Sequence, residues 1–137
     1  MTNHSRIYEK SCKRILLYEK ENRNFIDIFY HQFMGLSEEV RGKISSTNFH
    51  HQKIMLRNSL MYMQRYYESG YAGEYLTKLA RSHGPKGSNI SCEMYDLWLE
   101  ALLSTLLECD PGYTKEVKTA WSKVLKPGLD FVKSHCS

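Results

Sequence analysis

The chain has 137 residues, of which 42% are hydrophobic and 25% are charged. These are ordinary values for a globular protein, so they exclude a disordered chain, and this length suits one domain with its own core. No apolar run approaches the ~20 residues of a membrane span. The net charge of +4 is spread along the chain and is too weak to indicate a nucleic-acid surface. We therefore expect a single domain without membrane or nucleic-acid partners.

The polar start of the chain lacks the apolar segment of a secretory signal, which predicts a cytoplasmic, reducing location. The four cysteines, Cys12, Cys92, Cys109 and Cys136, are far apart in the sequence. No Cys-x-x-Cys pair exists, so the sequence does not support a zinc or iron–sulfur site. Buried or chemically idle thiols are the first expectation, with an exposed and reactive Cys136 as the alternative.

Helix-favouring residues dominate the periodic segments: Leu, Met, Glu, Lys, Arg and Tyr are common there, and clean alternation is absent. Start and stop signals predict about six or seven helices and an all-α domain. In chain order the expected helices are 5–20, a helix from Asn22 or Asn24 to Gly35, a short one opening at Ser37, one from Thr47 or Asn48 to Ser69, then 73–82, 91–109 and 114–133. A loop is expected over 86–90, and Pro127 should kink the last helix.

Two polar side chains fall where the helical pattern asks for apolar ones. Gln52 begins a stripe on the long helix whose other members are small or apolar. Tyr30 lies in the apolar stretch of the second helix, and a buried tyrosine hydroxyl usually finds a partner. The interior is therefore expected to receive two hydrogen-bond donors from two different helices.

His83 stands where the fifth expected helix breaks off, on the same face as Leu76, Leu79 and Ala80. Neutral imidazole is the commonest metal ligand in proteins, and the Gly84-Pro85 pair fixes the backbone directly after it. The adjacent His50-His51 pair faces two sides of its helix and cannot chelate one ion; either one could replace Gln52 if that helix were shifted.

The segment LTKLARSHGPKGSNISCEMYDLWLEALL resembles the proximal stretch of bacterial globins, most closely the sensor-type globins and their single-domain relatives. In that group a Phe-Tyr pair precedes the iron-binding histidine by just over fifty residues, and here Phe29-Tyr30 precedes His83 by 53. Gln52 occupies the distal position 22 residues after the tyrosine, and the tail AWSKVLKPGLDF resembles the last globin helix. The resemblance covers residues 24–133.

The resemblance implies a globin fold around haem b (iron protoporphyrin IX), in one domain over 1–137 with an N-terminal helix at 1–20 and a core at 22–133. His83 would be the proximal iron ligand. Tyr30 would be the first distal donor and Gln52 the second. Most globins place phenylalanine at the position of Ile44, and Phe49 lies close enough to substitute for it. The implied haem-pocket residues are Phe29, Ile44, Phe49, Leu56, Leu79, Met94, Leu97 and Trp98.

The implied function is reversible binding of O₂, CO and NO, for oxygen storage or transport or for gas sensing. A homodimer through the last two helices, and a separate output or reductase partner, belong to the same expectation. A rival hypothesis is an NO dioxygenase or peroxidase-like enzyme supplied by an external reductant, since no flavin or nicotinamide motif occurs. A second rival is a globin-shaped interaction module that binds no haem.

Overall fold

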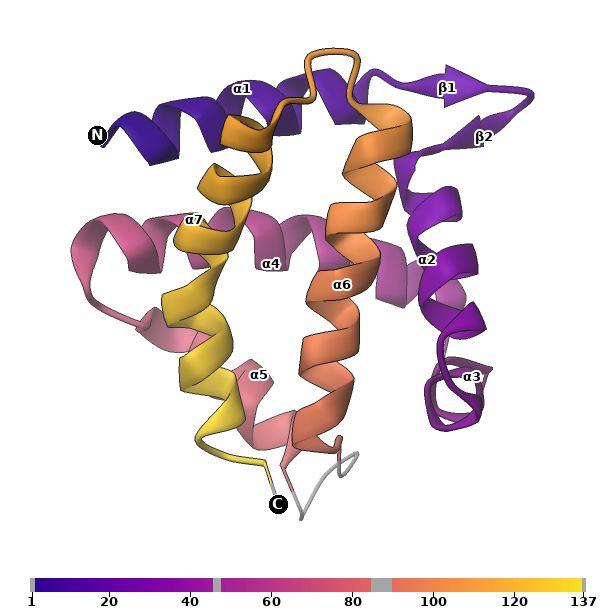
Figure 1. The fold of residues 1–137 in the computed structure, drawn as a ribbon. Helices are drawn as coiled ribbons and strands as arrows, with labels where there is room; N and C mark the ends of the chain where they lie inside the picture. The colour runs from indigo at the N-terminus through magenta and orange to yellow at the C-terminus, as the bar shows by residue number, and fades with distance from the viewer. Residues whose placement is uncertain (1, 46–47, 85–89, 137) are drawn as a thin grey trace.

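Seven helices and one short hairpin form the part of the chain that the computed structural model describes, residues 2–45, 48–84 and 90–136 (Figure 1). The all-α prediction is confirmed over these residues. In chain order the elements are α1 (Asn3–Leu16), β1 (Glu19–Lys20), β2 (Arg23–Asn24), α2 (Phe25–Gly35), α3 (Glu38–Ser45), α4 (Phe49–Ser69), α5 (Gly73–His83), α6 (Cys92–Cys109) and α7 (Lys115–Lys133).

Side-chain caps begin most of these helices where the sequence predicted them. The Asn24 side chain accepts from the Asp27 N–H while Asp27 accepts from the Asn24 N–H, a reciprocal capping box. Asn48 caps α4, and Ser91 caps α6. Gly70 ends α4 in the left-handed conformation with φ of 74°, which favours glycine because it has no side chain.

The first predicted helix is too long at its C-terminal end. α1 ends at Leu16, and the residues up to Asn24 form the antiparallel hairpin of β1 and β2 instead of continuing the helix. Glu21 and Asn22 have φ of 55° and 61°, so both central turn residues are left-handed, as in a type I′ hairpin turn. Strands of two residues are too short to show alternation, so the sequence pattern carried no signal for them.

Two other expectations concern the connections between helices. α5 ends at His83, one residue later than predicted, and Asn48 rather than Thr47 is the residue before α4. Thr47 itself and residues 86–89 of the predicted loop lie outside the described residues. Ile90 is described, and its N–H donates to the His83 carbonyl oxygen at 2.9 Å.

α7 is the central element of the packing. It contacts α1, α4 and α5 and runs antiparallel beside α6, with α4 crossing behind both in the view of Figure 1. Its inward face is fully buried at Trp121, Val124 and Leu125. The helix continues through Pro127, which has no N–H to donate to the carbonyl of Lys123 one turn earlier.

A close approach between α4 and α7 depends on the glycine after that proline. Gly128 is buried, and a Cβ added to it would stand 2.6 Å from Met63 Cγ and 3.1 Å from Met63 Cβ. Those Met63 atoms lie near the α4 backbone and cannot swing away easily. A side chain at this position would therefore push the two helices apart.

α1 is fastened to the rest of the domain by buried polar and aromatic contacts. The Tyr8 hydroxyl donates to the Leu60 carbonyl oxygen at 2.7 Å, and the Tyr8 ring packs against Trp121 with centroids 4.7 Å apart. Both aromatic residues are fully buried. Aromatic pairs of this kind contribute about 1 kcal/mol beyond the area they bury.

A second group of polar contacts joins α1 to the turn between α6 and α7. The buried Asp110 carboxylate accepts from the Ser11 hydroxyl, from the Arg14 guanidinium and from the Gly112 N–H at 2.8 Å. Burial alone would raise the pKa of Asp110. The hydrogen bonds and the Arg14 charge outweigh burial, so its pKa lies below the ordinary value and the carboxylate is ionised at neutral pH.

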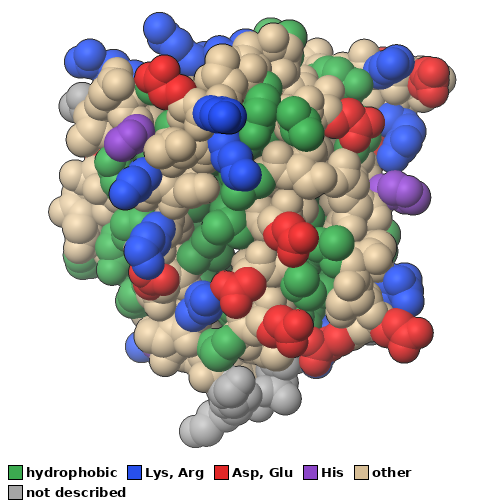
Figure 2. Space-filling view, viewed as in Figure 1, with side chains coloured by type: hydrophobic (Ala, Val, Ile, Leu, Met, Phe, Trp, Pro, Cys, Tyr) green, Lys and Arg blue, Asp and Glu red, His purple; other side chains and the backbone are tan. Residues whose placement is uncertain are grey.

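The surface carries charges of both signs. Figure 2 shows Lys and Arg side chains interspersed with Asp and Glu over the α6–α7 face, with apolar side chains exposed between the two helices. On this face, the charges do not gather into one large area of a single sign. Among the described residues, no helix combines the length and apolar character that crossing a bilayer requires.

Candidate functional site

A cavity of about 390 Å³ lies among the helices α2 to α7. This volume falls in the range of small-molecule and cofactor sites. Five predicted pocket residues border it: Ile44, Leu56, Leu79, Met94 and Trp98. The three predicted polar residues, Tyr30, Gln52 and His83, border it as well. Further lining residues that the sequence reasoning did not name for this role are Phe33, Lys43, Met55, Ser59, Met63, Ile90, Tyr95, Leu129 and Val132.

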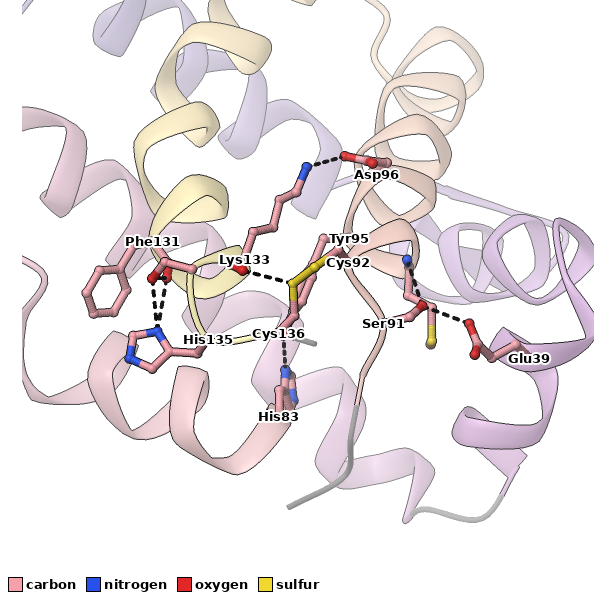
Figure 3. Close-up of a disulfide and its surroundings, with 12 residues drawn as sticks. Glu39, His83, Ser91, Cys92, Tyr95, Asp96, Phe131, Lys133, His135 and Cys136 are labelled. Carbon is pink, nitrogen blue, oxygen red and sulfur yellow. Dashed lines mark hydrogen bonds and ion pairs between the residues drawn. A yellow bond between two sulfur atoms is a disulfide. The ribbon is translucent and has the colours of Figure 1, made fainter. Parts of the chain in front are cut away.

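His83 reaches the cavity from the last residue of α5. Its Nδ1 lies 3.1 Å from the Tyr95 hydroxyl of α6, and Figure 3 shows the two side chains pointing toward each other. Burial lowers the pKa of His83, so its imidazole is neutral at pH 7. In the tautomer with a proton on Nδ1, His83 donates to Tyr95, and the Nε2 lone pair takes no part in that hydrogen bond.

Tyr95 is a site residue that sequence reasoning missed. It follows His83 by 12 residues and comes from a different helix, so no local spacing signals their contact. Tyr95 is 8% exposed, and burial raises the pKa of its hydroxyl to about 12. The hydroxyl therefore stays protonated and uncharged at physiological pH, where it can accept a hydrogen bond from His83.

Tyr30 and Gln52 meet at the cavity, as the sequence pattern suggested for two donors from two helices. The Tyr30 hydroxyl donates to the backbone carbonyl oxygen of Gln52 at 2.8 Å. Burial, followed by the neighbouring Tyr75, raises the pKa of Tyr30, which keeps its hydroxyl protonated. A hydroxyl proton can rotate about the C–O bond, so Tyr30 can redirect it toward a guest in the cavity.

Three of the predicted pocket residues are absent from the described cavity wall: Phe29, Phe49 and Leu97. Phe29 is fully buried behind the wall, with its ring 4.9 Å from that of Tyr30. Phe49 is 39% exposed and packs its ring edge-to-face with Tyr30 at 5.1 Å. Both rings support Tyr30 instead of bordering the cavity, and Ile44 is the apolar residue that borders it near the end of α3.

The alternative ligands His50 and His51 do not border the cavity. Both are exposed in the first turn of α4, where the His51 N–H donates to the Asn48 cap. Gln52, directly after them, is half-buried and lines the cavity. The register with Gln52 facing inward therefore holds in the structure.

The expectation of idle thiols is wrong for two of the four cysteines. Cys92, the first residue of α6, forms a disulfide with Cys136, which follows α7, and the two Cα atoms are 5.6 Å apart (Figure 3). Cys12 and Cys109 are free thiols. Forty-four residues separate the bonded pair, and only the packing of α6 beside α7 brings their ends together. Cys136 is therefore half-buried and bonded, not a free reactive thiol.

The geometry as a whole is that of a globin: an all-α domain around a largely apolar cavity, with a histidine at a helix end facing into it. A solved structure from Pseudomonas aeruginosa PAO1, of a protein described as structurally highly homologous to a human hemoglobin, has the same fold with a TM-score of 0.89. The two sequences are 31% identical, and the alignment covers 98% of this chain and all of that one.

The chain belongs to the bacterial globins. Its sequence matches no protein-family model and no curated protein.

Proposed function

We propose that this globin binds haem b in the cavity and uses it to bind O₂, CO and NO reversibly. The observation that carries the proposal is His83 in the wall of a globin cavity, with Nδ1 held by Tyr95 and Nε2 left for a metal. When bound, haem supplies an iron whose sixth coordination position takes a diatomic gas.

The residues around His83 fit an axial ligand. Metal-binding histidines usually donate their second ring N–H to a fixed partner, which sets the tautomer and the orientation of the ring. Tyr95 is such a partner at 3.1 Å, and its burial limits other rotamers. The neutral imidazole, favoured by the lowered pKa of His83, is the form that coordinates.

The rest of the cavity fits a flat, largely apolar group with an acidic edge. Leu56, Leu79, Met94 and Trp98 supply apolar contacts, and protoporphyrin buries most of its surface in such surroundings. Lys43 borders the same cavity from α3. A lysine at this place supplies positive charge for the carboxylates of a porphyrin edge.

Tyr30 and Gln52 supply the polar part of the cavity. A hydroxyl donor in a water-poor pocket stabilises a partly negative guest such as bound oxygen by about 1 kcal/mol or more. The Tyr30 hydroxyl already has an acceptor in the Gln52 carbonyl, so it is held near α4 when no gas is present. We infer that Tyr30 is the main donor and that the Gln52 amide assists it.

We base the proposed role in the cell on the resemblance to the sensor-type globins. A cytoplasmic gas-binding globin of this kind would store or carry oxygen, or would sense gas by passing a change at His83 to a separate output protein. Pairing of two chains through the last two helices is part of the same proposal. The exposed apolar side chains between α6 and α7 in Figure 2 support such pairing.

Gas binding is tested with the haem-loaded, reduced chain under O₂, CO and NO in turn. We expect a spectral change with each gas that reverses when the gas is removed or exchanged. In the Tyr30→Phe variant, oxygen should dissociate about 5- to 30-fold faster, because one hydrogen bond of about 1–2 kcal/mol is lost.

Tyr71→Phe is the matched control, since Tyr71 is 77% exposed and is not among the residues that line the cavity. It should leave the dissociation rate unchanged. A chain that takes up no haem would contradict the proposal and leave a haem-free interaction module. Rapid, repeated consumption of NO with a reductant would instead point to a dioxygenase.

A further inference from the structure

The disulfide joins two parts of the chain that lie near His83. Cys92 begins α6, one helical turn before Tyr95, the hydrogen-bond partner of His83. Cys136 follows α7, whose residues Leu129 and Val132 line the cavity. Figure 3 shows the disulfide, Tyr95 and His83 together at this end of the domain.

The segment that carries Cys136 also covers the backbone next to His83. The carbonyl oxygen of His135 lies 3.3 Å from the point where a Cβ would stand on Gly84. Gly84 is buried and directly follows His83. The covalent tie at Cys136 therefore holds this segment against both α6 and the end of α5.

The ion pair between the same two helix ends is weak. Lys133 Nζ lies 2.7 Å from an Asp96 carboxylate oxygen, but the Asp96 side chain is 66% exposed. An exposed ion pair contributes little to stability, because water and salt screen it. When the disulfide opens, the end of α7 loses its covalent link to α6.

The Cys92–Cys136 disulfide is positioned for reversible exchange with a dithiol. Both cysteines are half-buried and not sealed in the core, and we place the attack of a small thiol on the sulfur of Cys136. A thiolate of the dithiol bonds to that sulfur while the S–S bond breaks and Cys92 leaves as a thiolate. The positive end of the α6 dipole stabilises this leaving group. The second thiol of the reductant then displaces Cys136, so two electrons and two protons pass to the protein and the dithiol becomes a cyclic disulfide.

We propose that Cys92–Cys136 is a reversible dithiol–disulfide switch that sets how firmly the His83 side of the cavity is held. In a reducing compartment, disulfides are usually transient and redox-sensing. The regulatory meaning of the switch rests on the proposed function, because the held group is the proposed haem ligand. The loosening itself is a property of the chain and can be measured without haem.

The first test compares the two redox forms of the haem-free chain. Incubation with dithiothreitol under native conditions should raise the free thiols from two, Cys12 and Cys109, to four, and a mild oxidant should reverse this. Hydrogen exchange should then be faster over residues 80–84 and 129–136 in the dithiol form, while α1 stays unchanged. A disulfide that resists dithiothreitol in the folded chain, or equal exchange in both forms, would overturn the proposal.

The second test measures transfer of haem from the loaded chain to an excess of an acceptor globin. The dithiol form should release haem at least about fivefold faster, the lower end of coupling between linked sites. The Cys92→Ser/Cys136→Ser variant should match the dithiol form and ignore dithiothreitol. Equal release from both redox forms would overturn the switch, whereas a chain that binds no haem would refute only the proposed function and leave the exchange test to decide.

Discussion

Replacing Tyr95 with phenylalanine removes the hydroxyl that contacts the His83 ring and keeps the aromatic packing. The lost hydrogen bond is 3.1 Å long and joins a buried phenol to a half-buried imidazole. A net loss of about 1–2 kcal/mol is expected, because the His83 N–H is left without this acceptor in surroundings poor in water. That loss corresponds to about 5- to 30-fold faster release of haem.

The assay has two readouts. Haem transfer to an acceptor globin measures retention, and resonance Raman spectroscopy measures the iron–histidine stretching frequency. The frequency should fall in Tyr95→Phe, because a hydrogen-bonded imidazole is a stronger donor to the metal than one without an acceptor. Loss of packing alone would not shift it. Tyr71→Phe, at an exposed position, serves as the control for both readouts.

The reasoning fails if Tyr95→Phe retains haem as well as the unaltered chain and shows the same stretching frequency. That result would mean that the contact between His83 and Tyr95 does not orient the ligand, or that His83 is not the ligand.

The remaining predictions concern stability. Asp110 has a pKa below its ordinary value in the folded chain. Its contribution to the free energy of unfolding is therefore present above the unfolded pKa near 3.8 and is lost as the pH falls through the folded pKa. Urea unfolding of Asp110→Asn should show about 2–3 kcal/mol less stability than the unaltered chain at pH 7, and a smaller loss of stability on acidification. Gly128→Ala should destabilise the chain by about 1–2 kcal/mol, despite the better helix propensity of alanine, because its Cβ would meet Met63. Gly42→Ala, with open space around its Cβ position, should stabilise the chain by up to about 1 kcal/mol in the same assay. Equal effects of the two substitutions would refute the close contact between α4 and α7. Opening the Cys92–Cys136 link should lower thermal stability by up to about 4 kcal/mol, the chain-entropy value for a loop of 44 residues, and a calorimetric scan that is unchanged by dithiothreitol would contradict this.

The helices could be read from the sequence because their signals are local. Asn24, Ser91 and Gly70 act within one turn of their own position, and the structure places the helix ends where these residues predicted them. The hairpin at 19–24 escaped notice because two residues per strand give no periodic pattern. It depends instead on two left-handed turn residues without a glycine.

Only part of the candidate site could be predicted from the sequence. His83, Tyr30 and Gln52 stand out because each is polar on an apolar helical face, and the structure puts all three at one cavity. Tyr95 gave no such signal, because a tyrosine on an apolar helix is usually an ordinary core residue.

No signal in the sequence indicated which helix ends contact each other. The Cys92–Cys136 link spans 44 residues and depends on the antiparallel packing of α6 and α7. The globin resemblance implied that Phe29 and Phe49 line the cavity, whereas their rings pack against Tyr30. Spacing along a helix fixes a face, but the packing of neighbouring helices decides which side chains reach the space between them.

The most direct test of the central claim, that His83 holds haem in this cavity, is the visible absorption spectrum of the haem-titrated chain. Spectra are taken in the ferric state, after reduction and under CO, for the unaltered chain, for His83→Ala and for the exposed control His51→Ala. We expect a Soret band that shifts on reduction and again under CO, that is unchanged in His51→Ala, and that is lost or altered in His83→Ala. A chain without a Soret band, or a His83→Ala variant with an unaltered one, would contradict the claim.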